Sequence, residues 1–179
     1  MKALVVYESM FGNTAAVAES IASGIGTALE VQLLEIGAAP SALPVDLDLL
    51  VVGGPTHAFS LSRPQTRREA RSQGASFGQE LEGLREWLGS VQVHRVPALA
   101  TFDTRVGKVR HLPGSAAKKA AKLARERGLG RALDQRSFWV VDTPGPLQTG
   151  ELARARQWGA SLADRVAAAT GAEAIRGER

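Results

Sequence analysis

Residues 3–14 read Ala3-Leu-Val-Val-Tyr-Glu-Ser-Met-Phe-Gly-Asn-Thr14, and this stretch decides the fold. Its first five residues form an apolar run, which is typical of a strand covered on both faces. The polar residues that follow lead into residues 14–28, where Val17, Ile21 and Ile25 recur at a helical spacing. A buried strand that turns directly into a helix is the unit from which parallel α/β sheets are built.

The same alternation of strand and helix continues along the chain. Each further strand-like run is short, rich in β-branched or aromatic residues, and bounded by turn-forming residues. We expect the further strands at residues 31–36, 49–52, 97–102 and 138–141, and the further helices at residues 79–89, 115–127 and 150–169. The first of these runs is interrupted by polar residues, which favours an edge strand. The order predicts the α/β class, with a doubly wound parallel sheet and helices on both faces.

Length and composition bound the possible classes of protein. The 179 residues suit one domain, so we expect residues 1–179 to fold together. The apolar runs are far shorter than the roughly 20 residues that a membrane-spanning helix needs. Cysteine is absent, which excludes disulfides and thiolate metal sites. Because the first three residues lead straight into a strand, we expect no signal peptide and a cytoplasmic location.

The charge is distributed unevenly along the chain, whose formal net charge is +4. Residues 1–62 hold one basic and six acidic residues, whereas residues 63–179 hold 21 basic and 12 acidic residues. Residues 105–136 alone hold ten basic residues against Glu126 and Asp134. Such a surface attracts acidic proteins or phosphorylated molecules, while a specific nucleic-acid role is less favoured than a solvated helix surface.

Residues 8–14 combine groups that can hold a phosphate. Ser9, Asn13 and Thr14 offer side-chain donors, and Gly12 permits close approach of the backbone. The start of a helix adds free N–H groups and a partial positive charge. A plain capped helix uses the same residue types, so the segment alone leaves both interpretations open. No P-loop motif occurs in the chain, and the pair of glycines at residues 24 and 26 lies inside the expected helix instead of a turn.

Together these segments resemble the flavodoxins and flavodoxin-like proteins. Residues 6–14 are similar to the FMN phosphate loop of that family, residues 51–57 to its third strand and first flavin-ring loop, and residues 101–105 to its second ring loop. The resemblance spans essentially the whole chain. It implies a five-stranded sheet in the order 2-1-3-4-5 and one bound FMN.

The resemblance also implies which residues bind FMN. They are Ser9, Met10, Phe11, Gly12, Asn13 and Thr14 at the phosphate, and Pro55, Thr56, His57, Ala58, Phe59, Phe102, Asp103, Thr104 and Arg105 at the ring. Phe59 and Phe102 are candidates to cover a ring face, although Phe102 suits a core position equally well. His57 is a candidate hydrogen-bond donor, Asp103 an acceptor for a ring N–H, and Arg105 a contact for substrate or the reduced ring. A solvent-facing histidine and a surface ion pair are the alternatives.

Three functions follow from these observations. The favoured one is an FMN-binding electron-transfer protein, with no catalytic side chain and no metal because the cofactor carries the electrons. The second is an FMN-dependent reductase of quinones with a nicotinamide donor, in which the basic loop at residues 63–71 borders the pocket. The third is an interaction module without cofactor. The family's carriers are acidic and flank the ring with Trp and Tyr, whereas this chain is basic and has neither in its ring loops, so we expect an acidic redox partner.

Overall fold

The computed structural model describes residues 1–76 and 82–177. Its elements are β1 (Lys2–Tyr7), α1 (Asn13–Ile25), β2 (Glu30–Glu35), β3 (Leu47–Pro55), α2 (Pro64–Ser72), α3 (Leu84–Ser90), β4 (Ala98–Val106), α4 (Ala116–Glu126), β5 (Asp134–Val140) and α5 (Glu151–Gly177), with short 3₁₀ helices at Ile36–Ala38 and Gly107–Val109. The strands form one sheet in the order β2-β1-β3-β4-β5, and every pairing is parallel. The strand order expected from the sequence is confirmed, as is the position of β2 at an edge.

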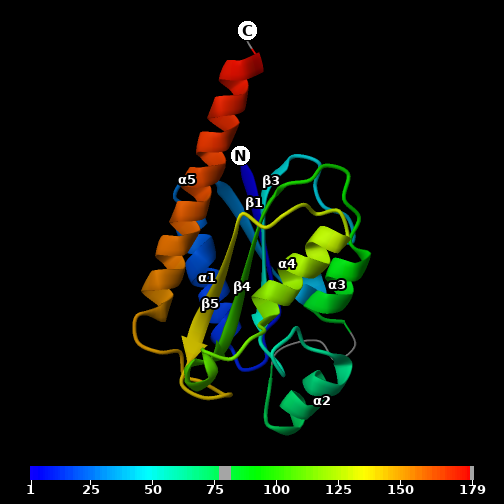
Figure 1. Cartoon of the computed structure of the whole chain (residues 1–179), viewed down its shortest axis with the longest axis vertical. Helices are drawn as coiled ribbons and strands as arrows, with labels where there is room; N and C mark the ends of the chain where they lie inside the picture. Colours follow the sequence, from blue (N-terminus) through cyan, green and yellow to red (C-terminus); the bar gives the residue numbers. More distant parts are fainter. Residues whose placement is uncertain (77–81, 178–179) are drawn as a thin grey trace.

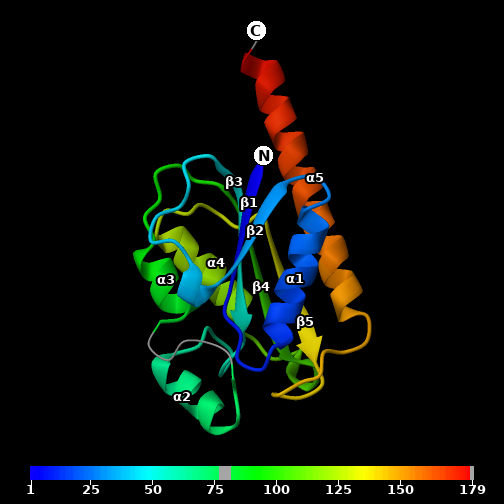
Figure 2. The same ribbon diagram turned by 180° about the vertical axis from the view of Figure 1, so that it is seen from behind.

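Helices cover both faces of the sheet (Figures 1 and 2). Helices α1 and α5 lie side by side on one face, and α3 and α4 lie on the other. Helix α2 lies beyond the carboxyl ends of the strands, and α5 extends past their amino ends. Among the helices that the structure describes, none has the length and apolar character to cross a membrane.

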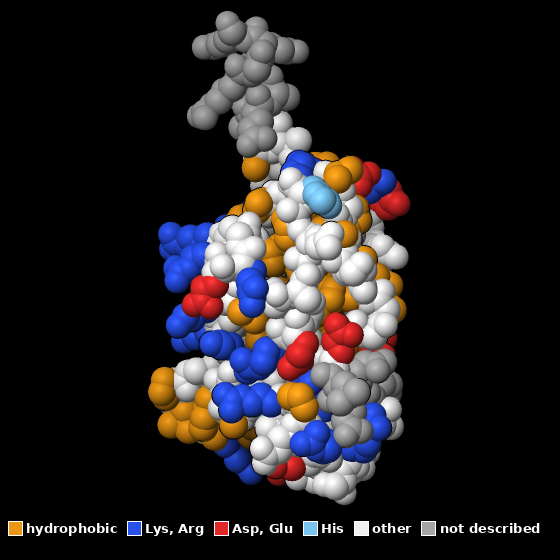
Figure 3. All heavy atoms as spheres, turned by 90° about the vertical axis from the view of Figure 1, so that its right-hand side faces the viewer, with side chains coloured by type: hydrophobic (Ala, Val, Ile, Leu, Met, Phe, Trp, Pro, Cys, Tyr) orange, Lys and Arg blue, Asp and Glu red, His pale blue; other side chains and the backbone are white. Residues whose placement is uncertain are grey.

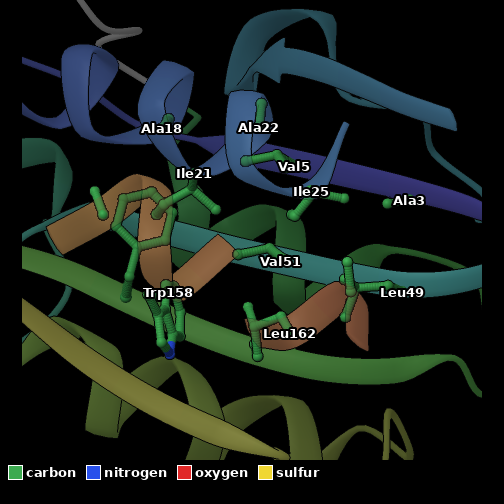
Figure 4. Packing of buried hydrophobic residues seen from close by; sticks show 14 of the residues in the cluster. Ala3, Val5, Ala18, Ile21, Ala22, Ile25, Leu49, Val51, Trp158 and Leu162 are labelled. Atoms are coloured by element: carbon green, nitrogen blue, oxygen red, sulfur yellow. The ribbon is translucent and has the colours of Figure 1, made fainter. Parts of the chain in front are cut away.

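The core between the sheet and the α1–α5 pair explains the apolar runs of the sequence. Val5 and Val51 lie in the sheet, Ile21 lies on α1, and Trp158 and Leu162 lie on α5; all five are buried in one cluster (Figure 4). The helical spacing of apolar residues in the first helix therefore marks its buried face.

The opposite face of the sheet packs on α3 and α4. Leu50 and Val52 of β3 meet Leu84, Trp87 and Leu88 of α3 in a second buried cluster. Five alanines of α4 are buried, namely Ala116, Ala117, Ala120, Ala121 and Ala124. Small side chains let α4 approach the sheet closely, and Ser115 caps the helix by accepting a hydrogen bond from the Lys118 N–H at 3.2 Å.

The segment at residues 63–71 was expected from the sequence to be a basic loop, and this expectation is wrong. Residues Pro64–Ser72 form α2, so the basic segment at 63–71 is a helix instead of a loop. Pro64 suits the first turn, and the Thr66 hydroxyl accepts a hydrogen bond from the Arg63 N–H at 2.9 Å. Its polar composition hid the helix, because Arg67 and Ala70 are the helix residues that are buried. The helix expected at 79–89 is observed as Leu84–Ser90, and its first residues, with Leu81, fall outside the described residues.

The bounds of β4 and β5 differ from the expectation in a way that matters for the site. Strand β4 continues to Val106, so residues 103–105 are paired strand residues instead of a loop. Strand β5 begins at Asp134, and Val141 lies outside it with 47 % of its surface exposed. The first residues of β5, from Asp134 to Ser137, are polar but pair in parallel with β4. A prediction based on apolar runs alone therefore misses them.

Candidate functional site

A cavity of about 200 Å³ opens at the carboxyl ends of β1, β3, β4 and β5. Parallel α/β sheets bind their ligands at this end, beside the point where the strand order reverses. The cavity is lined by Met10, Phe11, Asn13, Thr14, Pro55, Thr56, His57, Ala58, Thr104, Arg105, Val106, Val140 and Thr143. Segments from four parts of the chain therefore meet at one place.

The loop between β1 and α1 presents its backbone N–H groups without partners. In the part of the chain that the structure describes, the N–H groups of residues 10–14 donate no hydrogen bond. Gly12 has φ 83°, a left-handed conformation that favours glycine, and precedes the first turn of α1. No acidic side chain lies in that first turn. Such N–H groups at a helix start form a site for an anion.

Side chains of the same loop connect it to the neighbouring strands. The hydroxyls of Thr14 and Thr104 lie 2.7 Å apart and share a buried hydrogen bond in which either can donate. The Asn13 Nδ2 donates to the Pro144 carbonyl at 3.1 Å. The Ser9 hydroxyl accepts from the Ala15 N–H at 3.3 Å and is buried below the loop. These bonds hold the loop in a fixed position over the sheet.

The loop after β3 forms a tight, strained turn. His57 and Ser60 exchange two backbone hydrogen bonds of 2.9 Å. The two residues between them, Ala58 and Phe59, have φ angles of 45° and 62°. Asn and Gly usually occupy such positions, because other side chains are strained there. Phe59 is 46 % exposed and does not line the cavity.

His57 lies in the wall of the cavity, with an unsatisfied ring nitrogen. Its Nε2 is buried and lacks a hydrogen-bond partner among the described residues. Burial lowers the pKa of His57, and the positive charge of Arg67 lowers it further. The imidazole is therefore neutral near pH 7. The solvent-facing alternative considered for this histidine does not hold.

Arg105 lines the cavity and fixes the loop that follows β4. Its guanidinium donates to the carbonyls of Gly114, Val109 and Leu112 at 3.0, 2.8 and 3.2 Å. It also lies over the Trp139 ring, 5.7 Å from the ring centre. Its Nε is buried without a partner among the described residues. The surface ion pair considered for Arg105 is therefore absent from the described structure.

Asp103 and Phe102 do not line the cavity; Asp103 differs from its expected place at the ring, whereas Phe102 takes the core position that the sequence also allowed. The Asp103 Oδ2 accepts hydrogen bonds from the Thr56 hydroxyl and the Ala117 N–H, both at 3.0 Å, and so anchors the start of α4. Phe102 is fully buried in the α1–α5 core and packs edge-on against Phe138, with ring centres 6.3 Å apart. The reason is the alternation of side chains along β4, which sends neighbours to opposite faces.

The cavity thus brings together most of the residues expected from the sequence. Ten of them line it, namely Met10, Phe11, Asn13, Thr14, Pro55, Thr56, His57, Ala58, Thr104 and Arg105. Ser9 and Gly12 belong to the loop before α1 but do not line the cavity, and Phe59, Phe102 and Asp103 do not line it either. Sequence reasoning missed Val106, Val140 and Thr143. Val106 and Val140 are the last paired residues of β4 and β5, and Thr143 follows β5 by three residues, so they could have been found only if the strand ends had been known.

Sequence reasoning also gave no role to Glu8, which connects the end of β1 to Ser62, before α2, and to the start of α3. Glu8 is buried at the end of β1 and accepts hydrogen bonds from the Ser62 hydroxyl and from the Leu84 N–H. Arg67 donates to the same Ser62 hydroxyl at 2.8 Å and pairs with Glu86 at 3.1 Å. Burial raises the pKa of Glu8, and the two hydrogen bonds and Arg67 oppose that rise. This network joins β1 to α2 and α3 behind the cavity.

Comparison with known proteins defines the class of fold. No family model and no curated protein sequence matches the chain. Among solved structures, a short-chain flavodoxin associated with a PDU bacterial microcompartment is 14% identical, with a TM-score of 0.61, and 93% of this chain covers 99% of that one. A flavodoxin from the domain Archaea is 20% identical, with a TM-score of 0.59 and the same coverage of 93% and 99%. The Streptococcus pneumonia TIGR4 flavodoxin is 15% identical, with a TM-score of 0.58 and coverage of 92% and 99%.

The chain therefore has the flavodoxin-like fold. The likeness extends over nearly the whole length of each of these structures, and it agrees with the strand order of the sheet. At this level of identity the comparison establishes the architecture, and the chemistry has to be argued from the cavity itself.

Proposed function

We propose that this protein binds FMN in the cavity at the carboxyl ends of the strands and transfers electrons with it. The single observation that carries the proposal is the row of unpaired N–H groups of residues 10–14 beside that cavity. Unpaired donors are uncommon in folded proteins unless water or a ligand satisfies them. A phosphate ester suits them because it brings several acceptor oxygens and a negative charge.

The remaining walls of the cavity fit a planar, mostly apolar ring with a polar edge. Pro55, Val106 and Val140 provide apolar surface. The buried His57 Nε2 and Arg105 Nε offer polar atoms that have no partner among the described residues. We expect these two groups to contact the polar edge of the flavin. The solved structures of similar fold include several flavodoxins, which supports the choice of FMN.

A bound flavin supplies the electron-accepting chemistry, and the side chains of this chain set its surroundings. Thr14 and Asn13 keep the phosphate loop in place through their bonds to Thr104 and Pro144. Neutral His57 adds no charge to the cavity, whereas the guanidinium of Arg105 places one positive charge in its wall. That positive charge favours a negatively charged group bound in the cavity.

The test is a titration of the purified protein with FMN and, separately, with riboflavin. Riboflavin has the same ring but lacks the phosphate, so it cannot use the N–H groups of residues 10–14. We expect FMN to bind at least roughly tenfold more tightly, as several charge-assisted hydrogen bonds require. Equal affinity for the two flavins would show that residues 10–14 do not bind the phosphate. Failure to bind either flavin would favour an interaction module without cofactor.

One observation favours a second candidate, an FMN-dependent reductase of small molecules such as quinones. A cleft of about 250 Å³ adjoins the cavity and shares Phe11, His57, Ala58 and Thr143 with it. Its far wall is α2, through Thr66, Glu69, Ala70 and Gln73. A small substrate bound there would lie next to the proposed ring site. Steady turnover of a quinone by the purified protein with NADH or NADPH would support this candidate over a pure electron carrier.

A further inference from the structure

A groove outside the proposed FMN site gathers basic side chains. It lies between α4 and the start of β5, has a volume of about 360 Å³, and is named here the α4 groove. It is lined by Lys118, Ala121, Lys122, Arg125, Arg131, Ala132 and Gln135. No carboxylate stands among these lining residues. Figure 3 shows lysine and arginine side chains gathered along the flank where α4 lies.

The helical repeat of α4 explains why the charges converge. Lys118, Lys122 and Arg125 follow one another at steps of four and three residues, which places them on one face of the helix. They span about 10 Å along the helix axis. Arg131 reaches the same groove from the segment that leads into β5. Ala116, Ala120 and Ala124 lie on the opposite face of α4 and are buried, whereas Lys118, Lys122 and Arg125 are exposed to solvent.

These cations have little to neutralise them within the molecule. Glu126 is the acidic residue of α4, and it pairs with Lys122 at 3.9 Å, where both side chains are about half exposed. Within the described residues, Lys118, Arg125 and Arg131 form no ion pair. Four like charges facing one groove repel one another, and an anionic partner relieves that repulsion.

The structure also separates this groove from the rest of the basic stretch at residues 105–136. Arg105 belongs to the cavity, where it donates to three carbonyls. Arg136 faces the other side of the sheet, pairs with Asp134 at 3.3 Å and lies over Trp158. Of the ten basic residues at 105–136, Arg105 and Arg136 therefore do not belong to the α4 groove.

We propose that the α4 groove binds an acidic segment of a partner protein. The spacing of the cations along α4 suits successive carboxylates of a peptide, and Ala121, Ala132 and Gln135 offer surface for their side-chain stems. Single-stranded nucleic acid is recognised largely by stacking of bases on aromatic rings. No aromatic side chain lines the groove, so the lining favours a carboxylate-bearing partner.

The groove is connected to the proposed electron-transfer site through the first turn of α4. The Ala116 N–H donates to the Thr56 hydroxyl at 2.9 Å, and Thr56 lines the cavity. Lys118, the first cation of the groove, follows two residues later. As a docking site for a redox partner the groove rests on the proposed function, whereas its affinity for acidic peptides does not. A partner bound along the groove would come nearest to the cavity at Lys118, whereas Arg125 and Arg131 lie toward the amino end of β5.

The experiment uses a fluorescent peptide of ten glutamates as the probe and the full chain as the receptor. Binding is measured by fluorescence anisotropy at low and at physiological salt, and the contact surface is mapped by NMR chemical-shift changes. We expect the shifts to centre on α4 and residues 131–135, and the affinity to fall as salt rises, because exposed charges are screened. No flavin is required, so failure here and failure of FMN binding are read separately.

Matched variants locate the binding surface. Lys118→Glu and Arg125→Glu reverse exposed charges of the groove, whereas Arg156→Glu makes the same change on exposed α5. We expect each groove variant to weaken peptide binding about threefold or more, and Arg156→Glu to change it little. Circular dichroism checks that all three variants fold. Equal weakening by the α5 variant, shifts centred elsewhere, or tighter binding of a single-stranded oligonucleotide through the same residues would overturn the proposal.

Discussion

Thr14 joins the proposed phosphate loop to β4, so its hydroxyl should matter for FMN binding. The bond to Thr104 is buried and only 2.7 Å long. If Thr104 donates it, the Thr14 proton is free for a phosphate oxygen. We expect Thr14→Ala to weaken FMN binding roughly ten- to hundredfold, which is the value of one hydrogen bond to a charged group. Fluorescence titration measures it, and Thr14→Ser, which keeps the hydroxyl, should retain most of the affinity.

His57 gives the stability of the fold a dependence on pH. Its pKa in the folded protein lies below the ordinary value of 6.5 because the ring is buried. Between the two values the unfolded chain binds more protons, so stability rises with pH through this window and is lost as pH falls. We expect His57→Gln to lose less stability than the natural protein between pH 7.5 and pH 5.5.

Urea unfolding at the two pH values measures this difference. The matched control is His94→Gln, because His94 is exposed in a loop. That variant should follow the pH dependence of the natural protein. If His57→Gln followed it as well, His57 would not be the titrating group.

The packing of α1 against α5 depends on two glycines that let the helices touch. A Cβ on Gly159 would lie 2.2 Å from the Ile21 carbonyl oxygen, and one on Gly24 would lie 2.0 Å from the Arg156 oxygen. Both atoms belong to backbone that cannot move aside without separating the helices. We expect Gly159→Ala to lower the free energy of unfolding by about 1–3 kcal/mol, as overpacking does.

A second glycine on α5 provides the control for that prediction. Gly171 has no atom within 4 Å of an added Cβ. Alanine favours a helix over glycine by roughly 0.5–1 kcal/mol, so Gly171→Ala should leave stability unchanged or raise it. Chemical unfolding of both variants measures the difference, and a loss of similar size in the two would show that close packing is not the cause.

The loop after β4 is held by one side chain, and its order should depend on that side chain. Arg105 donates to the carbonyls of Val109, Leu112 and Gly114. A lysine cannot present the same planar set of donors. We expect Arg105→Lys to speed hydrogen exchange at residues 107–114 and to weaken FMN binding. Arg110→Lys, in the same loop but exposed, should change neither, and slow exchange in both variants would contradict this role.

The strands could be predicted because their apolar residues are buried on both faces of the sheet, and α1 and α5 because each buries one apolar face against it. Helix α2 could not, since most of its residues face solvent and leave no apolar period. The positions of Phe102 and Asp103 outside the cavity have another cause. The sequence does not tell that β4 continues to Val106, and along this strand Phe102 points to one face of the sheet and Asp103 to the other, so neither lines the cavity. The unpaired N–H groups of residues 10–14 lie in the glycine-containing loop that the sequence analysis identified as a candidate phosphate site.

The whole molecule separates its stable part from its binding part. The apolar clusters on the two faces of the sheet are fully packed. The loop between β1 and α1, in contrast, has unpaired N–H groups, and the turn at Ala58 and Phe59 is strained. A ligand that binds only the folded state adds to its stability. FMN should therefore stabilise the whole fold but slow exchange locally, at the N–H groups that it satisfies.

Hydrogen exchange with and without FMN tests this division. We expect the N–H groups of residues 10–14 to exchange quickly in the free protein and slowly with FMN, because only then do they donate hydrogen bonds. The strand β1 before them should be protected in both states, since it is paired on both sides. At a hundredfold excess over Kd, FMN should add about 2.7 kcal/mol to the free energy of unfolding. Riboflavin should leave residues 10–14 unprotected, and protection of these groups by riboflavin would place the phosphate elsewhere.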